Sequence, residues 1–456
     1  MSKQKSSEST MQQFGYREQL KRSLDFWDLL IYGIIFMVPI APFGIYGYVA
    51  SISKGMVPLV YLIGMTGMLF TALSYARLSE VFPIAGSIYS YAQRGINEHI
   101  GFFAGWLILL DYMLIPALLY LVSATALHNM IPILPKSFWL IFFVMINTTI
   151  NILGIEITAK TNRVVVALEI IVLIIFISVG LTAVSNHING AQFSINPLFN
   201  KEEFNLTILM SAVSIAVLSF LGFDSISTLT EEVKGESATV GKIVGKAIIL
   251  TIPVVGIMFI AQTWVAAMIM PDYTSFVNLE EAFYEVAHIA GGTWLKGITS
   301  VATALAWGIA NALVAQAAIS RILFSMARDR KLPSILATIH PIFKTPYVST
   351  ILVGLISLAI ILGGTTIDDL ASLVNFGALT AFLILHITVI NHFIIRKKSK
   401  DYLKHLIFPL IGLIIIGYAW MSLGSLAKEL GFFWISIGLI YMILMKLLHK
   451  EGFISE

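Results

Sequence analysis

The chain has 456 residues, of which 57% are hydrophobic and only 12% are charged. The apolar share lies well above that of a soluble domain and the charged share is about half the usual value, which argues against a soluble, disordered or nucleic-acid-binding protein. The net charge of +3 indicates no polyanionic partner, and the absence of cysteine excludes disulfides, thiolate nucleophiles and thiolate metal sites.

Apolar runs long enough to cross a membrane recur along the chain. About 30 Å of hydrocarbon needs roughly 20 apolar residues in a helix. The runs are 26–50, 56–82, 98–127, 137–155, 162–186, 206–230, 243–270, 294–326, 346–364, 369–395, 405–424 and 431–448. The sequence therefore predicts an all-α membrane protein with twelve transmembrane helices. Residues 1–25 are expected to be a retained polar tail, because the first run has full length and no small-residue cleavage site follows it.

The distribution of lysine and arginine predicts the orientation in the membrane. With the N-terminus on the cytoplasmic side, only five of the 29 lysines and arginines lie outside. They are Lys54, Lys136, Lys201, Lys296 and Lys428. Because cytoplasmic loops carry the excess of positive charge, both terminal tails, 1–25 and 449–456, are predicted to be cytoplasmic. Acidic residues outnumber these lysines outside, which either enriches cations at the mouth or reflects ordinary solvated loops.

Two of the apolar runs are interrupted near the middle of the membrane. In the first, Met37 to Gly44 reads MVPIAPFG, and each proline removes a backbone donor and clashes with the preceding turn. In the sixth, Ser219 to Asp224 reads SFLGFD, with a glycine and a carboxylate at similar depth. Paired breaks point to the central site of a transporter, because unwound backbone is tolerated in a membrane only where it lines protein or water. The alternative is that proline and glycine are merely common kinks.

The two interrupted runs each open a set of five helices. This arrangement predicts an inverted repeat, with residues 26–186 as the first unit and 206–395 as the second. Residues 405–448 then form two helices outside the repeat. The expected fold is thus a five-plus-five inverted-repeat transporter with broken helices 1 and 6.

Ionisable residues inside the predicted spans are candidates for the site, since a carboxylate at mid-bilayer costs about 2.5–3.5 kcal/mol. Asp224 lies beside the second break, where it and freed carbonyls can receive an ammonium group; its alternative role is to cap the following half-helix. Asp111 lies near the middle of the third span and is followed by Tyr112, so the pair offers charge, a ring face and a hydroxyl to a cation. A hydrogen bond between Asp111 and a neighbouring helix is an equally good explanation.

Four further ionisable residues are weaker candidates. Glu169 in the fifth span is a candidate proton carrier, although a carboxylate near the cytoplasmic end that reaches water is the simpler explanation. Glu231 and Glu232 end the sixth span beside Lys234, which suggests an inner-gate ion pair or a solvated surface. His386 in the tenth span can exchange protons near neutral pH, but a hydrogen-bonded packing role explains it better.

Signatures of enzymes and pumps are absent from the sequence. There is no histidine pair with the spacing of a metalloprotease helix, no phosphate-binding Gly-Lys-Ser/Thr loop and no Gly-x-Ser-x-Gly elbow. No metal, cofactor or enzymatic activity is therefore expected. A channel is disfavoured as well, since no span contains a filter-like or charge-ring segment.

Three stretches resemble, in the same order, those of the amino acid, polyamine and organocation permeases. They are SYARLSEVFPIAGSIYSYAQRGI, SFLGFDSISTLTEEVKG and SRILFSMARDRKLPSILATIHPIFKTP. The resemblance extends over about residues 20–450. Within this superfamily the chain is most similar to the bacterial putrescine importers, in YGIIFMVPIAPFGIYGYV, LLDYMLIP, LGFDSISTLTEE and LVNFGALTAF.

The resemblance implies a bundle of helices 1, 2, 6 and 7 that rocks against a scaffold of helices 3, 4, 8 and 9. It also implies proton-coupled uptake or exchange of a small amine or amino acid across a bacterial cell membrane. Asp224 falls where many relatives carry the acidic residue of helix 6 that closes the substrate site. Asp111 and Tyr112 fall where relatives line the pocket for the distal end of the substrate.

Two positions depart from the pattern of the family. Leu218 replaces a common aromatic residue just before the second break, so Phe220 or Phe223 is expected to supply the aromatic gate instead. Glu169 falls where some relatives carry Lys or Gln, so a role in proton coupling is not simply inherited.

The segment MVPIAPFG bears on the substrate. Amino acid carriers of the family have a Gly-Ser-Gly type of break whose bare amides grip a carboxylate, whereas two prolines here remove donors. This favours a diamine such as putrescine. The remaining amides of Met37, Val38 and Ile40 keep a neutral amino acid symporter or exchanger as the alternative. A nutrient sensor that does not transport is disfavoured by the short cytoplasmic loops.

These assignments define a predicted site. The substrate contacts are Met37, Val38, Pro39, Asp111, Tyr112, Ser219, Phe220, Gly222, Phe223 and Asp224. Protons are expected to exchange at Asp224 or Glu169, and Glu231 and Glu232 are expected at the inner gate. The expected partners are a small amine or amino acid, protons and membrane lipid, with no nucleic acid; the sequence gives no indication of the oligomeric state.

Overall fold

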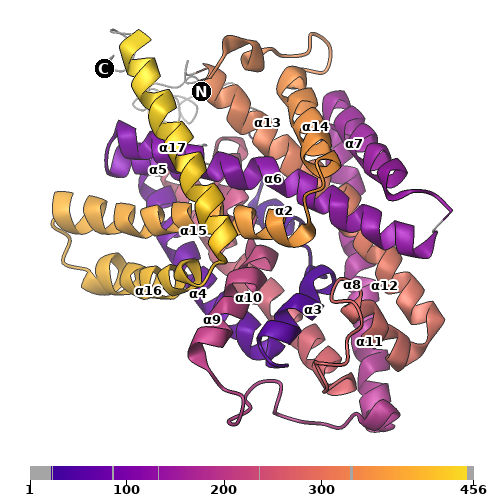
Figure 1. Ribbon diagram of the computed structural model, residues 1–456. Helices are drawn as coiled ribbons and strands as arrows, with labels where there is room; N and C mark the ends of the chain where they lie inside the picture. Colours follow the sequence, from indigo (N-terminus) through magenta and orange to yellow (C-terminus); the bar gives the residue numbers. More distant parts are fainter. Residues whose placement is uncertain are drawn as a thin grey trace.

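The computed structural model describes residue 22 and residues 24–84, 87–131, 133–235, 237–328 and 332–448. In these ranges the chain is helical (Figure 1), and the extended pairing recorded there is one isolated bridge between Leu24 and Val233. Apart from Arg22, Leu24 and Asp25, the predicted tails at either end of the chain lie outside the described residues.

The first half of the chain contains seven α-helices and one 3₁₀ turn in the described ranges. In chain order they are α2 (Phe26–Met37), α3 (Pro42–Ile52), α4 (Val57–Val81), α5 (Ser87–Gly95), α6 (Glu98–Met130), α7 (Lys136–Leu153), α8 (Ile155–Ser185) and η1 (Ile188–Gly190). Polar side chains cap the first turns of α2 and α6, whose N-cap residues are Asp25 and Asn97. Asp25 accepts hydrogen bonds from the amides of Trp27 and Asp28 at 2.8 and 3.0 Å, which satisfies donors that have no partner inside α2.

The second half continues with shorter and more irregular elements. They are α9 (Leu206–Ala216), η2 (Val217–Phe220), η3 (Phe223–Glu232), α10 (Ser237–Ile269), α11 (Ala282–Gly291), α12 (Thr293–Leu305), η4 (Ala306–Asn311), α13 (Ala312–Arg328), η5 (Ser334–Ala337), α14 (Tyr347–Leu362), α15 (Ile367–Val389), η6 (Ile390–Arg396), η7 (Leu403–Ile407), α16 (Phe408–Met421) and α17 (Ser425–Leu448). Here η2, η3 and η5 are 3₁₀ helices, whereas η4, η6 and η7 are π-helices.

Ten described helical stretches are long and apolar enough to cross a membrane, and the bent pair α2 and α3 raises the number to as many as eleven. The predicted span that falls short is 346–364, where α14 has 16 residues. At 1.5 Å per residue, α14 covers about 24 Å, which is less than the hydrocarbon thickness of about 30 Å. Length and composition therefore support ten or eleven spans in the described ranges rather than the predicted twelve.

The first apolar segment is interrupted between α2 and α3, which are bent by 55° relative to each other. Val38 has a positive φ of 54°, and residues 39–41 lead to Pro42, the first residue of α3. Proline is tolerated at that position because the first helical residue has no intrahelical N–H bond to lose. We call residues 38–41 the first interruption.

The sixth apolar segment is interrupted between η2 and η3. Leu221 is extended, and Gly222 has a φ of 106°, a conformation that residues with side chains rarely adopt. A side chain at Gly222 would also overlap the ring of Phe36 in α2. Glycine therefore permits both the turn and the close approach of the two segments. We call Leu221 and Gly222 the second interruption.

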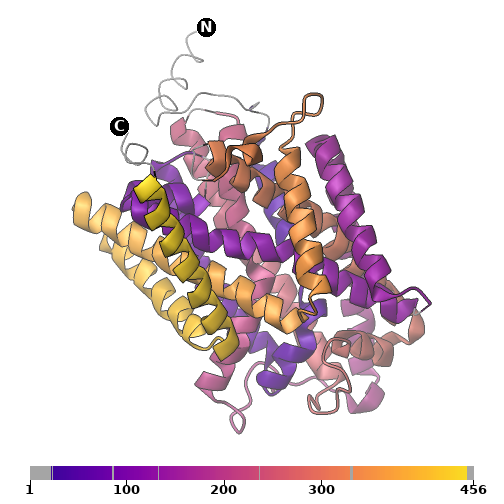
Figure 2. The same cartoon turned by 45° about the horizontal axis from the view of Figure 1, so that its top comes forward.

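The helices pack in two groups (Figures 1 and 2). In the first group, α4 lies along α10, and α2, α3, α9 and η3 pack with them. In the second group, α6 packs against α7, α12, α13 and α14. The remaining helices surround these groups: α8 contacts α10 and α12, and α15 lies along α6 and carries α16 and α17 at one edge of the molecule.

Candidate functional site

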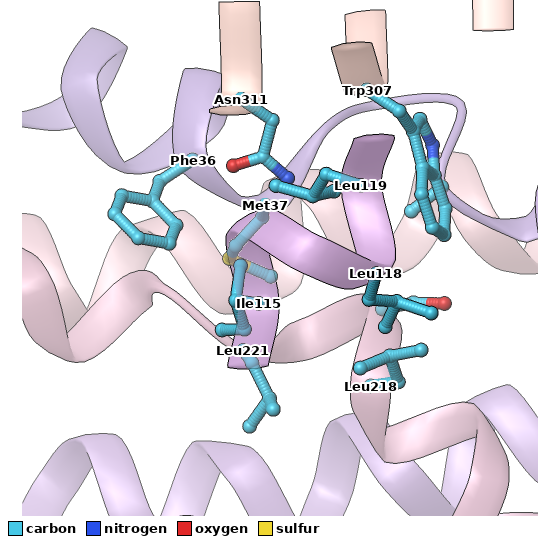
Figure 3. Close-up of a pocket in the computed structure, with 11 residues that line it drawn as sticks. Phe36, Met37, Ile115, Leu118, Leu119, Leu218, Leu221, Trp307 and Asn311 are labelled. Carbon is cyan, nitrogen blue, oxygen red and sulfur yellow. The ribbon is translucent and has the colours of Figure 1, made fainter. Parts of the chain in front are cut away.

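A cavity of about 380 Å³ lies where the two interruptions approach α6 and η4 (Figure 3). Its lining residues are Phe36, Met37, Ala41, Ile115, Leu118, Leu119, Leu218, Ser219, Leu221, Trp307 and Asn311. Figure 3 shows Trp307 and Asn311 of η4 across the cavity from Leu218 and Leu221. We call this space the central cavity, and both packed groups contribute to its wall.

The lining is mostly apolar but contains three polar side chains. Asn311 is 8% exposed, and its side-chain oxygen has no hydrogen-bond partner. The indole N–H of Trp307 is also buried without a partner, whereas the hydroxyl of Ser219 lies 3.0 Å from the hydroxyl of Tyr61. Leaving a buried polar atom unpaired costs about 1–3 kcal/mol, so Asn311 and Trp307 are suited to meet a ligand.

Trp307 and Asn311 both belong to the π-helix η4. Such segments are rare, and they occur frequently at functional sites. Asn147 of α7 supports η4 from the other side by donating a 2.7 Å hydrogen bond to the carbonyl of Gly308. Packing of α7 against η4 therefore helps to fix the two side chains that face the cavity.

The backbone of the first interruption is bonded within the protein. The amide of Val38 donates to the carbonyl of Ile35 at 3.3 Å, and the carbonyl of Pro39 accepts a 2.9 Å hydrogen bond from Gln262 of α10. From the sequence, the Val38 amide is expected to be available to a substrate carboxylate. In the structure this amide already donates a hydrogen bond within the tight turn before Pro39. The first interruption thus offers few donors to an anionic group.

Asp224 is buried, with 2% of its surface exposed, and its oxygen Oδ2 accepts three hydroxyl hydrogen bonds. The donors are Tyr112 of α6 at 3.1 Å, Tyr75 of α4 at 3.4 Å and Ser87 of α5 at 3.5 Å. These neutral hydroxyls orient the carboxylate and solvate it, but they do not balance its charge. Asp224 and Tyr112, both predicted for the site, are thus in direct contact.

Asp111 of α6 is a second buried carboxylate, also 2% exposed, and its oxygen Oδ1 has no hydrogen-bond partner in the described part of the chain. It lies one helical turn from Ile115, which lines the central cavity. Within the described ranges, neither Asp111 nor Asp224 forms an ion pair with a lysine or arginine. Two buried carboxylates without a compensating cation therefore lie beside the cavity.

Phe36 connects the central cavity to the surroundings of Asp224 through Tyr112. Phe36 lines the cavity, and its ring centroid lies 6.2 Å from that of Tyr112, whose hydroxyl contacts Asp224. The carboxylate is therefore close to the cavity but is not part of its lining.

The predicted substrate contacts form three groups: residues that line the central cavity, residues near it, and residues that pack away from it. Met37 and Ser219 line the central cavity. The predicted residues that lie in or near the surrounding wall are Val38, Pro39, Asp111, Tyr112, Gly222 and Asp224. The two predicted aromatic residues, Phe220 and Phe223, point elsewhere.

Phe220 and Phe223 are packed among aromatic rings of other helices. Phe220 lies 5.2 Å from the ring centroid of Phe259, and Phe223 lies 5.7 Å from that of Phe382. The expected aromatic gate at these positions is therefore not part of the cavity lining. Phe36 and Trp307 supply the lining rings instead, because the turn at the second interruption directs its two phenylalanines into the helix packing.

Glu169 of α8 is 1% exposed, and neither carboxylate oxygen has a hydrogen-bond partner among the residues that the structure describes. A Glu169 that reaches cytoplasmic water is one of the two explanations drawn from the sequence. Its burial argues against that explanation and leaves a carboxyl group in the packed interior without a structural partner.

An ion pair lies at the predicted inner gate. Glu232 lies 4.0 Å from Arg321 of α13, and both side chains are partly exposed. Because Glu232 ends η3 in the first group and Arg321 belongs to the second, this pair connects the two groups. Lys234 is not its partner; its backbone amide donates to the carbonyl of Leu24 at 2.9 Å. Glu231 precedes Glu232 in η3 and is partly exposed.

His386 of α15 is fully buried against α4 and α16. Its ring nitrogens lie 2.9 Å from the hydroxyl of Ser74 and 3.2 Å from that of Thr71. The ring also occupies the space beside Gly412, where a side chain would collide with it. These contacts fit the hydrogen-bonded packing role preferred from the sequence.

Besides the aliphatic lining residues, five side chains of the site are missing from the sequence predictions. Tyr75 and Ser87 belong to the stretch SYARLSEVFPIAGSIYSYAQRGI, which carries the family resemblance, but nothing in it indicates a contact with Asp224. Trp307 and Asn311 are four residues apart in an apolar run, a spacing that places them on one helix face and is a readable signal. Phe36 gives no comparable signal, because it is one of many apolar residues in its span.

Comparison with known proteins identifies the family. The family model described as amino acid permease matches residues 25–445. The chain belongs to this amino acid permease family. The permease is therefore a multi-pass membrane transporter and not an enzyme.

Three relatives illustrate the range of substrates among similar proteins. The chain is 31% identical to the low-affinity putrescine importer PlaP of Escherichia coli (strain K12), over 93% of this chain and 94% of PlaP. It is 29% identical to the methylthioribose transporter of Bacillus subtilis (strain 168), over 92% and 91% of the two chains. It is 27% identical to the branched-chain amino acid permease BcaP of the same organism, over 95% of each chain.

Proposed function

We propose that this permease imports a small cationic amine, a diamine such as putrescine, across the bacterial cell membrane. The observation that carries the proposal is the pair of buried carboxylates, Asp224 and Asp111, which have no compensating cation in the described part of the chain. Uncompensated charge is costly inside a membrane protein, and an ammonium group would balance it. The similarity to a putrescine importer supports the same substrate class.

The central cavity suits the carbon chain of a diamine. Its apolar lining would contact the methylene groups, while the unpartnered oxygen of Asn311 would accept a hydrogen bond from one ammonium group. In this binding mode the ring of Phe36 turns aside, the other ammonium group reaches Asp224, and Asp111 adds negative charge nearby. Such a substrate needs no donors from the first interruption, in agreement with the bonded state of its backbone.

The proposed transport cycle moves the two packed groups relative to each other. The twelve-span arrangement counts α2 and α3 as one broken span and α14 as a short one, with 26–186 and 206–395 as inverted repeats and 405–448 as the appended pair. An even number of spans brings both ends of the chain to one side, and the distribution of lysine and arginine assigns that side to the cytoplasm. The Glu232–Arg321 pair, which joins the groups, would break when the inner side opens.

Proton coupling is proposed at Glu169 or Asp224. Both are buried carboxyl groups, and Glu169 has no hydrogen-bond partner in the described ranges. Taking up a proton would remove a charge that is costly at this depth, and releasing it would restore the charge. The membrane potential also favours entry of a cation, by about 2.3 kcal/mol per charge per 100 mV.

A neutral amino acid is the second candidate substrate. The observation that favours it is that no charged residue lines the central cavity. Leu118, Leu119 and Leu218 would accommodate a branched side chain, and BcaP shows that a similar chain is a branched-chain amino acid permease. The occupied amide of Val38 is the argument against it, because a carboxylate would need donors there.

Uptake of labelled putrescine into proteoliposomes tests the proposal. We expect saturable uptake that increases with an inside-negative potential and is competed by other diamines but not by leucine. Absence of saturable uptake, or competition by leucine, would contradict the amine proposal. Thermal stabilisation by putrescine without any flux would indicate a sensor rather than a transporter.

A further inference from the structure

A second cavity of about 260 Å³ lies beside the central cavity, toward α11. Its lining residues are Gly44, Val122, Thr125, Ala126, Glu280, Tyr284 and Ile367. The two cavities follow the same helices: α6 lines the central cavity with Leu118 and Leu119 and the second cavity with residues one to two turns further along. Similarly, Ala41, just before α3, lines the central cavity, and Gly44 in α3 lines the second cavity. We call this second space the outer cavity.

The indole ring of Trp307 lines the central cavity and lies against Gly44, which lines the outer cavity. Its atoms Cζ2 and Cη2 lie 3.1 and 3.2 Å from the position that a Cβ at Gly44 would occupy, and Cγ1 of Val122 lies 3.4 Å from that position. The ring thus lies against the bare backbone of α3, next to residues of the outer cavity, while it also lines the central cavity. Trp307 is therefore the side chain of the central cavity whose contact with a residue of the outer cavity is shown directly.

Glu280 is the charged residue of the outer cavity. Its oxygen Oε1 accepts a hydrogen bond from the hydroxyl of Tyr48 at 3.4 Å, which is long for such a bond. Within the described ranges Glu280 forms no ion pair. Lys136, at the start of α7, interacts with Glu280 electrostatically but lies beyond ion-pair distance. The carboxylate therefore retains capacity for a cation that enters the cavity.

The surroundings of Glu280 favour cations over anions. Lys54 at the same end of the molecule is paired with Glu203 at 2.6 Å, so its charge is balanced. Glu285 follows on the first turn of α11, and Asp369 caps the start of α15 beside Ile367 of the outer cavity. Acidic groups around a narrow opening raise the local concentration of cations.

We infer that the outer cavity is a staging subsite that binds the primary ammonium group of an incoming amine before Trp307 admits it to the central cavity. This inference rests on the proposed amine substrate. Glu280 supplies the charge, and Tyr284 lines the same space with an aromatic ring, whose face attracts cations. The main site and the subsite thus lie in line along α6, and Trp307 of the main site contacts Gly44 of the subsite.

Equilibrium binding tests the subsite without relying on transport. The assay measures binding of tritiated putrescine to the purified full-length protein by scintillation proximity, in the background Asp224→Asn, which weakens the central site. We expect a residual weak component that decreases with added salt and disappears in the double variant Asp224→Asn/Glu280→Gln. The matched control Asp224→Asn/Glu285→Gln should keep it, because Glu285 lies nearby, on the first turn of α11, but does not line the cavity. Equal residual binding in both double variants would overturn the subsite.

Transport kinetics give a second readout in the otherwise unmodified protein. At low salt, Glu280→Gln should raise the KM for putrescine roughly tenfold and leave the maximal rate nearly unchanged, a change at the low end of known electrostatic focusing effects. An unaltered melting temperature would show that the variant folds. An unaltered KM with normal uptake would overturn the subsite alone, whereas absence of amine binding and uptake in the unmodified protein would overturn the proposed function together with it.

Discussion

At the first interruption, two prolines end one helix and start another, and the intervening backbone is bonded to Ile35 and Gln262. At the second interruption, Gly222 makes the turn and the carboxylate of Asp224 follows two residues later, held by three hydroxyls. At the first interruption, the Val38 amide and the Pro39 carbonyl are therefore bonded within the protein. At the second interruption, a carboxylate lies beside the turn. Under the proposed function, charge at the second interruption, rather than peptide dipoles at the first, would select the substrate.

Removing the charge at the second interruption should have the largest effect. Asp224→Asn keeps the size of the side chain, and we expect putrescine uptake to fall by at least about 100-fold, since loss of one partner of a buried charge pair costs about 2–5 kcal/mol. Uptake into proteoliposomes at equal protein content measures this. Asp401→Asn, which changes an exposed carboxylate paired with Lys404, should transport normally. Normal uptake by Asp224→Asn would show that the second interruption does not select by charge.

Distorting the turn at the second interruption should have the next largest effect. Gly222→Ala forces a side chain into a strained conformation, at a cost of about 1–3 kcal/mol, and against the ring of Phe36. We expect a lower melting temperature and a loss of uptake of roughly tenfold or more. Gly297→Ala is the matched control, because Gly297 lies in the helix α12 with open space around it. If Gly222→Ala and Gly297→Ala have the same melting temperature, the proposed strain at Gly222 is incorrect.

Releasing the backbone at the first interruption should have a moderate effect. Gln262→Ala leaves the carbonyl of Pro39 without its 2.9 Å hydrogen bond, and an unpaired buried acceptor costs about 1–3 kcal/mol of stability. We expect a lower melting temperature and a several-fold lower maximal rate, with the KM for putrescine almost unchanged. A large rise in KM with unchanged stability would mean instead that the first interruption contacts the substrate directly.

Breaking the ion pair between the two groups should have the smallest effect. Glu232 and Arg321 are 4.0 Å apart and partly exposed, and such pairs contribute only about 0–1 kcal/mol. Glu232→Gln should therefore change the uptake rate by about fivefold at most. Measuring putrescine uptake by Glu232→Gln and Asp224→Asn in the same assay shows which of the two residues matters more for transport. A greater loss in Glu232→Gln than in Asp224→Asn would move the centre of the site toward the inner end.

The positions of the interruptions could be predicted because they depend on local chemistry. Proline lacks an N–H donor and glycine tolerates positive φ, so MVPIAPFG and SFLGFD are visible in the sequence as places where a helix is unstable. The prediction of twelve spans is not confirmed at α14, because the helix begins after Pro346 and ends at Leu362, whereas the apolar run extends slightly further. Helix ends inside an apolar run depend on loop geometry that composition does not record.

The lining of the cavity could be predicted only in part. Met37 and Ser219 could be predicted from the sequence because they adjoin the interruptions. Phe220 and Phe223 also adjoin an interruption, but they pack elsewhere. A turn of one residue decides which side chains face inward, and that turn is set by tertiary contacts such as Gly222 with Phe36. Asn311 and Trp307 needed the packing of η4 against α6 and α7 to become part of the site.

A thermal-shift series with molecules of equal length but different charge tests the central claim most directly. The series is 1,4-diaminobutane, 4-aminobutanol and 1,4-butanediol, with leucine as the neutral amino acid, added to the purified protein. Because a ligand stabilises the folded protein in proportion to its binding, we expect the diamine to raise the melting temperature most, the amino alcohol less, and butanediol and leucine not at all. Stabilisation by leucine with none by the diamine would contradict selection by charge at Asp224.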